Sequence, residues 1–154
     1  MNKIKKIFFC RKAILEDMKL YYNWVNEPQV RKNSCDNKKH ISWHSHKNWF
    51  RKKIQDKSST LYVFEKKDVE VGQVRFEKQN KIVRINFSIC KKFRGCGLGK
   101  KMLKTAIRKY KLSKRITFIG EVKTKNLPSI KIFKSLGFMG NISNKIYYFK
   151  KIYI

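Results

Sequence analysis

The chain has 154 residues, of which 39 are Lys or Arg and 10 are Asp or Glu, so its formal net charge is +29. This length is typical of one domain and is enough to bury a core without disulfides or metals. No stretch is apolar over the length of a membrane span, which excludes membrane-spanning classes of protein.

The N-terminal residues are basic and then apolar, but the apolar part is too short for a signal peptide and no small-residue cleavage site follows. They instead predict a first strand over Lys3–Phe9. Neither C-x-x-C pairing nor metal-ligand spacing is found among the four cysteines, Cys10, Cys35, Cys90 and Cys96. We therefore predict free thiols in a reducing cytosol, a cytoplasmic protein and no metal site.

The positive charge has two interpretations. A chain this basic is typical of nucleic-acid binders, whose basic residues gather on one face or one helix. Here the lysines are spread over almost every segment and accompany many Asn and Ile residues, which favours compositional drift. Under either interpretation the surface attracts anions.

Two helices are predicted before the first long strand. Leu15–Val25 carries aromatic and apolar residues at helical spacing, and we expect Pro28 to close that helix. Ser42 is a candidate N-cap for the second helix. The apolar stripe of this second helix consists of Trp43, His46, Phe50 and Ile54.

Three strand candidates joined by short polar turns follow, and they predict an antiparallel meander. The strands cover Thr60–Phe64, Val69–Glu77 and Ile82–Ile89. In the third strand the residues alternate between two faces. The apolar face carries Val83, Ile85, Phe87 and Ile89, and the polar face carries Arg84, Asn86 and Ser88.

Three glycines, Gly95, Gly97 and Gly99, separate the strand Ile82–Ile89 from a helical pattern that runs to about Leu112. Glycine lets backbone approach a ligand closely, and a helix start offers free N–H groups and a partial positive charge. The stretch therefore has the features of a phosphate cradle. The alternative is an ordinary glycine-rich connection between a strand and a helix.

The rest of the chain alternates between strand and helix patterns. Arg115–Val122 predicts a strand, Asn126 is expected to cap the next helix, and Gly137 is expected to end it. Lys145–Ile154 alternates again and predicts the last strand. The predicted order is β-α-α-β-β-β-α-β-α-β, an α/β (α+β) chain.

Two motifs in this order resemble one family. The spacing Arg94-x-x-Gly97-x-Gly99 fits neither the Walker nor the Rossmann pattern. It resembles the pyrophosphate loop of the GNAT N-acetyltransferases, which bind acetyl-CoA. The segment Asn126–Phe138 resembles the family's second motif, Asn-x-x-Ala-x-x-x-Tyr followed by Gly-Phe.

This resemblance implies a GNAT fold in a single N-acetyltransferase domain over residues 1–154. The fold has a mixed central sheet with helices on both faces and two central parallel strands that splay apart, here Ile82–Ile89 and Arg115–Val122. The thioester arm of acetyl-CoA fits between the splayed strands. The implied cofactor-binding residues are Ile89, Cys90, Lys91, Arg94, Gly95, Cys96, Gly97, Leu98, Gly99, Lys100, Asn126, Ser129 and Phe133.

A narrower resemblance covers nearly the whole chain. Trp24–Ser34 and Ile41–Phe50 are similar to the acetyltransferases of the pseudaminic-acid pathway, and Gly72–Phe76 and Gly120–Lys123 fit the same set. Those enzymes acetylate the amine of a UDP-linked 4-amino-4,6-dideoxy sugar. The implied activity is acetyl transfer from acetyl-CoA to a nucleotide-linked amino-deoxy sugar, as in cell-surface glycan biosynthesis.

Two alternatives to this activity stay open. One is an N-acetyltransferase of a protein N-terminus or of another small-molecule amine. The other is a non-catalytic nucleic-acid-binding protein, which the intact glycine loop disfavours. We expect a small-molecule substrate, no nucleic acid and no membrane partner. The oligomeric state is open, a homodimer included.

Acetyl transfer needs a base for the amine and an acid for the leaving thiolate. The family often has a Tyr acid where this chain has Phe133, which has no proton to give. Glu121, at the end of a central strand, is the first candidate base, with a surface ion pair as its alternative role. His46 is the next candidate, with a place in the core as its alternative. Ser88, on the polar face of its strand, is a third candidate catalytic residue.

Five residues are candidates for binding the acceptor substrate. Arg31 and Arg75 can grip a diphosphate, because guanidinium matches phosphate in a fork. Trp24 and Trp43 can stack on a sugar or a base, although core packing is the commoner role of tryptophan. Asn86 joins them because it shares the polar face of its strand with Ser88.

Overall fold

The computed structural model describes residues 7–36, 39–110 and 115–154, so the predicted strand start at Lys3 and helix end at Leu112 lie outside the described residues. In chain order the elements are β1 (Phe8–Lys12), the 3₁₀ turn η1 (Leu15–Asp17), α1 (Met18–Val25), α2 (Pro28–Asn33), α3 (Trp43–Gln55), β2 (Ser59–Lys66), β3 (Val69–Gln79), β4 (Ile82–Ile89), the 3₁₀ turn η2 (Lys91–Phe93), α4 (Leu98–Lys109), β5 (Ile116–Lys123), α5 (Leu127–Ser135), β6 (Met139–Ser143) and β7 (Ile146–Tyr153).

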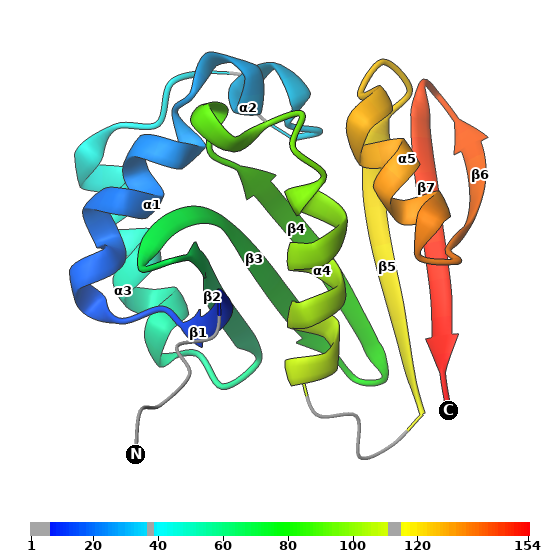
Figure 1. The fold of residues 1–154 in the computed structure, drawn as a ribbon, viewed down its shortest axis with the longest axis horizontal. Helices are drawn as coiled ribbons and strands as arrows, with labels where there is room; N and C mark the ends of the chain where they lie inside the picture. The colour runs from blue at the N-terminus through cyan, green and yellow to red at the C-terminus, as the bar shows by residue number, and fades with distance from the viewer. Residues whose placement is uncertain (1–6, 37–38, 111–114) are drawn as a thin grey trace.

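The described strands form one mixed sheet in the order β1-β2-β3-β4-β5-β7-β6. Every neighbouring pair is antiparallel except β4 and β5, which are parallel. The central position of β4, between β3 and β5, confirms the mixed sheet that the sequence predicted (Figure 1).

The two parallel strands are paired only at their beginnings. Ile82, Val83 and Arg84 of β4 are in register with residues 117–119 of β5. Beyond this point β4 keeps its pairing with β3 and β5 keeps its pairing with β7, but they no longer pair with each other. We call the unpaired stretch, Ile85–Ile89 beside Gly120–Lys123, the split. It confirms the predicted splay, and the ribbons diverge there in Figure 1.

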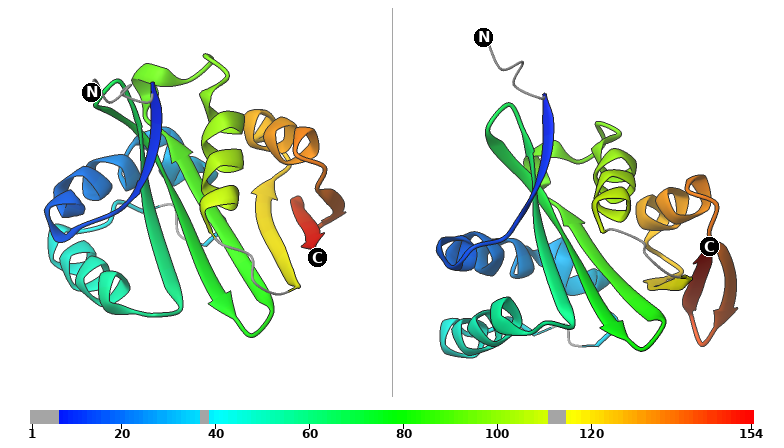
Figure 2. Two further views of the ribbon diagram at one scale, coloured as in Figure 1. Left: turned by 60° about the horizontal axis from the view of Figure 1, so that its bottom comes forward. Right: turned by 90° about the horizontal axis from the view of Figure 1, so that it is seen from below.

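Helices cover both faces of the sheet, as the sequence predicted. Figure 2 shows α4 and α5 on one side and α1, α2 and α3 on the other. The alternation of β2 divides its side chains between the two layers. Leu61 and Val63 pack against α1 and α3, whereas Tyr62 and Phe64 belong to the larger cluster with α4 and α5.

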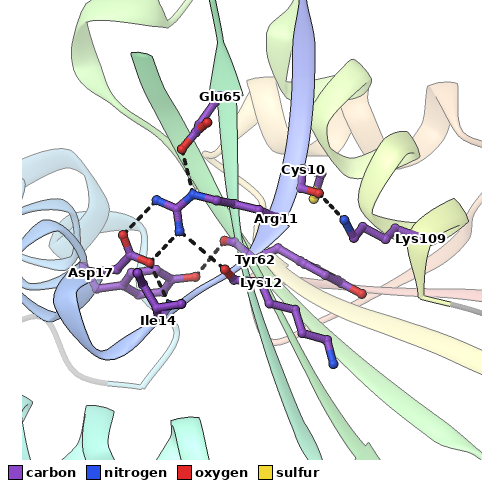
Figure 3. A network of polar contacts seen from close by, with 9 residues as sticks. Cys10, Arg11, Lys12, Ile14, Asp17, Tyr62, Glu65 and Lys109 are labelled. Atoms are coloured by element: carbon purple, nitrogen blue, oxygen red, sulfur yellow. Dashed lines mark hydrogen bonds and ion pairs between the residues drawn. The ribbon is translucent and has the colours of Figure 1, made fainter. Parts of the chain in front are cut away.

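An ion-pair network ties the first strand to its surroundings. The guanidinium of Arg11 on β1 donates to both carboxylate oxygens of Asp17, at 2.7 and 2.9 Å, and to Glu65 on β2 at 2.7 Å (Figure 3). Burial tends to raise the pKa of Asp17, but the bonds from Arg11 and from the Ile14 amide outweigh burial and hold this pKa below its ordinary value. The network fixes the entry into α1 against the edge of the sheet.

The structure corrects several predicted boundaries. Pro28 does not simply close the first helix; it begins α2 at a position where its missing N–H costs nothing. β1 continues past Phe9 to Lys12. β6 was not predicted, because all five of its residues are exposed and leave no apolar alternation to detect.

Three predicted helix ends are confirmed. The hydroxyl of Ser42 accepts the Ser45 amide at 3.1 Å, and the side chain of Asn126 accepts the Ser129 amide at 3.4 Å. Gly137 has a φ of +79°, and the amides after α5 turn back to bond Phe133 and Lys134. This arrangement is a Schellman motif, which ends a helix with a left-handed residue.

Phe133 fills the core on the α5 side of the split. Its ring is 2% exposed, is stacked on Phe149 at 4.9 Å and lies 5.7 Å from Phe87 of β4. The tip of the ring points at Gly120 of β5, where a Cβ would lie only 2.3 Å from Cζ. The phenylalanine and the glycine therefore fit each other, and a tyrosine hydroxyl at the same place would strike the β5 backbone.

We predict that Phe133→Tyr lowers the stability by about 1–3 kcal/mol, because overpacking strains a well-packed core. Urea denaturation of the purified variant measures this change. Phe9→Tyr is the matched control, since Phe9 is 45% exposed and the added hydroxyl reaches water. Unchanged stability in Phe133→Tyr would show that the ring tip has room for the hydroxyl.

Candidate active site

The glycine loop joins the end of β4 to the start of α4. Gly95 and Gly97 have φ values of +74° and +73°, a region that favours glycine. A Cβ at either position would meet no atom within 4 Å, so open space lies over both residues. Gly97 is the N-cap of α4 and supplies no side-chain cap. The first amides of the helix are thus available to an anion that enters this space.

The third glycine has a different role. A Cβ on Gly99 would lie 2.5 Å from Cδ1 of Ile132, so its absence lets α4 approach α5 closely. The neighbouring Leu98 is buried in the core. Gly99 and Leu98 were predicted to bind the cofactor. In the structure the lack of a side chain at Gly99 and the buried side chain of Leu98 serve packing, and only their backbone amides, in the first turn of α4, could contact a ligand.

Arg94 anchors the loop. Its Nε donates to the carbonyl of Ile89 at 2.9 Å, and its Nη2 pairs with the carboxylate of Glu27 at the N-cap of α2. Beside this contact, the Cys90 amide donates to the Val71 carbonyl at 2.8 Å, which continues the pairing of β3 with β4 past Ile89. The charge of Arg94 is therefore compensated within the chain, and this guanidinium ties β4, the loop and α2 together.

The remaining predicted cofactor residues are divided between surface and core. Lys91, Cys96 and Lys100 are exposed beside the loop. Asn126 and Ser129 are half-buried at the start of α5, where the Ser129 backbone amide donates to the Asn126 side-chain oxygen. Phe133 lies in the core, as described above.

The face of the sheet toward α1, α2 and α3 is polar beside the split, and we call it the polar face. The register places Gln73 of β3 opposite Ser88 of β4, and Arg75 opposite Asn86. These side chains alternate with the buried residues that face α4 and α5. The predicted division of β4 into an apolar and a polar face is thus present in the structure.

Glu121 of β5 lies on the polar face. Its carboxylate forms an ion pair with Arg84 of β4 across the beginning of the split. The Sγ of Cys35, from the segment after α2, lies 3.8 Å from the Glu121 carbonyl oxygen. The alternative role predicted for Glu121 was an ion pair with one of the many lysines; the ion pair is formed, but its partner is Arg84. It holds the carboxylate at the edge of the split.

Arg75 is the most enclosed cation of the polar face. Its guanidinium lies over the ring of Trp49, with Cζ 5.1 Å from the centroid, and its Nε is 3.7 Å from Glu77. That Nε is buried and makes no hydrogen bond among the described residues. Burial lowers the pKa of Arg75, and the charge of Glu77 opposes this effect. The guanidinium has an unused donor on the polar face.

Two predicted site residues belong to the core instead. His46 is 2% exposed between α1 and α3, and its Nε2 is 2.9 Å from the Met18 carbonyl oxygen. Burial lowers the pKa of His46, and the bond to Met18 opposes that shift. Trp24 is 5% exposed in the same cluster. Both therefore have the core-packing role that the sequence left open as the alternative.

Trp43 and Arg31 lie nearer the surface. Trp43 is 40% exposed at the start of α3, with Lys19 5.1 Å from its ring centroid. The Nε of Arg31 donates to the Val25 carbonyl at 2.6 Å, and burial lowers the pKa of this arginine. Arg31 thus holds α2 against the end of α1.

Sequence reasoning missed three residues that shape the site: Glu27, Trp49 and Gln73. All three stand inside segments whose resemblance could have pointed to them: Trp24–Ser34, Ile41–Phe50 and Gly72–Phe76. Arg84 was predicted on the polar face of its strand, but its ion pair with Glu121 depends on how β4 and β5 meet, which is not visible in the sequence.

Other features of the surface lie away from this site. A hollow of about 630 Å³ lies near the β3–β4 turn, and none of the predicted site residues line it. Within residues 7–36, 39–110 and 115–154, no group of three His, Cys, Asp or Glu side chains is placed to hold a metal ion. No helix in the described part of the chain is long and apolar enough to span a membrane.

Comparisons with known proteins agree with this geometry. The sequence profile of the acetyltransferase (GNAT) domain matches residues 9–139. No curated protein is similar enough in sequence to match the chain. Among solved structures, a domain from Methanocaldococcus jannaschii superposes with a TM-score of 0.81 at 18% identity, covering 95% of this chain and 98% of that one.

Two named enzymes have the same fold. Spermidine N-acetyltransferase from Vibrio cholerae, solved with CoA and spermine, gives a TM-score of 0.80 at 16% identity, over 97% of this chain and 96% of that one. The ribosomal L7/L12 α-N-protein acetyltransferase RimL, solved with coenzyme A, gives 0.80 at 15% identity over the same shares. At these identities the likeness is one of fold.

The profile match spans most of the chain, so the chain belongs to the GNAT acetyltransferase domain family. It is an N-acetyltransferase, and acetyl-CoA is its co-substrate. The open space over Gly95 and Gly97, beside the free amides of α4, fits the pyrophosphate of that co-substrate.

We predict that Gly97→Ala weakens coenzyme A binding by about tenfold or more, because the added Cβ occupies the space above the loop. Isothermal titration calorimetry with coenzyme A measures the affinity. Gly137→Ala is the matched control: its φ of +79° imposes a similar backbone strain at the far end of α5. Equal affinities in the two variants would place the pyrophosphate elsewhere.

Proposed function

We propose that the enzyme transfers acetyl from acetyl-CoA to the amine of a nucleotide-linked amino-deoxy sugar, of the UDP-4-amino-4,6-dideoxy-hexose type. The proposal treats residues 1–154 as one acetyltransferase domain that works in the cytoplasm. Its support comes from Trp24–Ser34 and Ile41–Phe50, the segments that resemble sugar acetyltransferases. They contribute to α1, α2 and α3, the helices on the side of the polar face.

The observation that carries this proposal is the unused donor of Arg75. The Arg75 side chain is half-buried, and its buried Nε makes no hydrogen bond among the described residues, which is costly. A diphosphate can accept two parallel hydrogen bonds from a guanidinium. The contact with Trp49 holds the guanidinium plane in place. In this proposal Arg75 binds the diphosphate of the acceptor, and Asn86, opposite it on β4, binds the sugar.

The co-substrate is assigned to the other side of the split. We assign its pyrophosphate to the amides of Gly95–Lys100, with exposed Lys100 supplying charge. The pantetheine arm is assigned to the edge formed by Ile89, Cys90 and Lys91, together with the side chain of Asn126. The Ile89 carbonyl and both backbone groups of Cys90 and of Lys91 already have partners in the chain, so the backbone contact is assigned to the Ile89 amide.

Acetyl-CoA supplies the acetyl group as a thioester, and the acceptor amine forms the new C–N bond at its carbonyl carbon. In our proposal Glu121 takes the proton that the amine loses, directly or through one water. Phe133 has no proton to give, and its ring is closed off in the core. As the C–S bond breaks, water therefore protonates the leaving thiolate, and Glu121 then returns its proton to the solvent, so no net proton is gained or lost.

We predict that Glu121→Gln lowers kcat by about 10²–10⁴-fold, with little change in the KM for acetyl-CoA, because the amide cannot accept the proton. Steady-state kinetics measure both constants. Arg84→Gln is the control that breaks the same ion pair but leaves the carboxylate. If the two variants lose activity equally, Glu121 is only an ion-pair partner.

The charge of the chain bears on the alternatives. A polyamine acceptor is a polycation and would be repelled by a chain of net charge +29, whereas a nucleotide-linked sugar is an anion and would be attracted. A protein N-terminus carries a single positive charge, so electrostatics disfavours it less. Membership of an acetyltransferase family makes a purely nucleic-acid-binding protein the weakest alternative.

We predict that, in a panel of UDP-, dTDP- and GDP-linked amino sugars, free amino sugars, polyamines and N-terminal peptides, a nucleotide-linked amino-deoxy sugar has the highest kcat/KM. Arg75→Met should raise the KM of that acceptor about tenfold or more and leave the KM of acetyl-CoA unchanged, because a remote contact contributes uniform binding. An acetyl-CoA assay measures both.

Arg108→Met is the matched control, since it removes one charge from the exposed side of α4. Equal efficiency with a free amino sugar and its nucleotide form would contradict the sugar assignment. That outcome would leave the acetyltransferase class intact.

A further inference from the structure

Gln73 is a buried polar residue with one unused hydrogen-bonding atom. Its side chain lies on the polar face and the residue is 7% exposed. The Nε2 donates to Asn86 Oδ1 at 3.1 Å and to Ser88 Oγ at 3.3 Å. The Oε1 is buried and has no partner among the described residues.

An arrangement of this kind destabilises a fold. A buried carbonyl without a donor loses its hydration and gains nothing in return, and natural proteins pair nearly all such groups. An apolar side chain of the same length would fill the space without this loss. Gln73 is therefore a poor choice for stability alone, which points to a donor that arrives with a ligand.

The surroundings of Gln73 indicate where that ligand lies. Ser88, its register partner, belongs to β4, the strand that borders the split. Arg75, two residues along β3 on the same face, carries the other buried side-chain atom that makes no hydrogen bond among the described residues, its Nε. One unused acceptor and one unused donor thus belong to residues two positions apart on the face that also carries Glu121.

We infer that Gln73 Oε1 accepts a hydrogen bond from the reacting amine of the acceptor and thereby orients it. A neutral primary amine has two N–H donors and one lone pair. If Glu121 receives one N–H and Gln73 receives the other, the lone pair is left to face the thioester carbon. The inference rests on acceptor binding at the polar face, as in the proposed function, but it does not depend on the acceptor being a nucleotide sugar.

The two bonds from Gln73 Nε2 also orient the neighbouring side chains of the polar face, Asn86 and Ser88. They occupy an acceptor oxygen on Asn86 and on Ser88, so the Asn86 amide N–H groups and the Ser88 hydroxyl proton are directed elsewhere. The polar face then offers donors from these two residues and from Arg75, with Gln73 as a neutral acceptor between them. Such a site discriminates strongly against molecules that lack the matching N–H.

The test compares Gln73→Met, which keeps length and removes both polar atoms, with Gln73→Glu, which keeps an acceptor oxygen. The readout is acetyl transfer to whichever acceptor of the panel above the wild type uses best, together with thermal melting. We expect Gln73→Met to melt at or above the wild-type temperature and to lose about 10- to 100-fold in kcat/KM for the acceptor. The KM of acetyl-CoA should not change, and Gln73→Glu should retain more activity than Gln73→Met.

Gln73→Glu separates contact with the amine from support of the neighbours. It removes the two bonds that Nε2 donates but keeps an acceptor oxygen, so it should keep more kcat/KM than Gln73→Met. Full activity in Gln73→Met, or equal losses in Gln73→Met and Gln73→Glu, would overturn the inference. Each comparison uses the acceptor that the wild type prefers. If the sugar assignment is wrong, the wild type will prefer another amine in the panel, and the test of Gln73 is then made with that amine.

Discussion

The structure depends on a parallel strand pair that stops early. After Arg84, β4 and β5 separate, while each keeps its antiparallel pairing on its other side, with β3 and β7 respectively. The backbone groups left along the split need partners, and an extended pantetheine arm can provide them. Phe133 supports the separation from the α5 side, where its ring tip occupies the space that a Cβ on Gly120 would need.

The two faces of the split have opposite characters. Toward α4 and α5 the packing is apolar, and it positions the glycine loop through Gly99 and Leu98. Toward α1, α2 and α3 the face carries Gln73, Arg75 and Glu121. Among the described residues, Gln73 and Arg75 each have a buried polar atom without a hydrogen bond, and Glu121 forms an ion pair with Arg84. The apolar face therefore contributes mainly to stability, and the polar face carries the groups assigned to recognition. Polar groups that lack partners in the fold are expected at a functional site, because packing alone would not retain them.

Local patterns predicted most of the fold because they are short-range effects. The alternation of Ile82–Ile89 appears unchanged as β4, and the caps at Ser42 and Asn126 form as expected. β6 was not predicted because an exposed edge strand has no apolar alternation. α2 was not predicted because Pro28 is compatible with both the end of one helix and the start of another. Among the site residues, the loop glycines carried a local signal, whereas Gln73 and Arg84 acquire their partners only through register.

The sequence by itself determined the acetyltransferase class, since the glycine loop and the Asn126–Phe138 segment are local motifs that already resemble that family. Only the tertiary structure decided the roles of individual side chains. It placed His46 and Trp24 in the core, paired Arg94 with Glu27 across 67 residues, and left Gln73 Oε1 and Arg75 Nε without hydrogen bonds among the described residues. Burial and hydrogen-bond partners depend on which distant segments meet, and residue type and spacing along one chain do not specify that meeting.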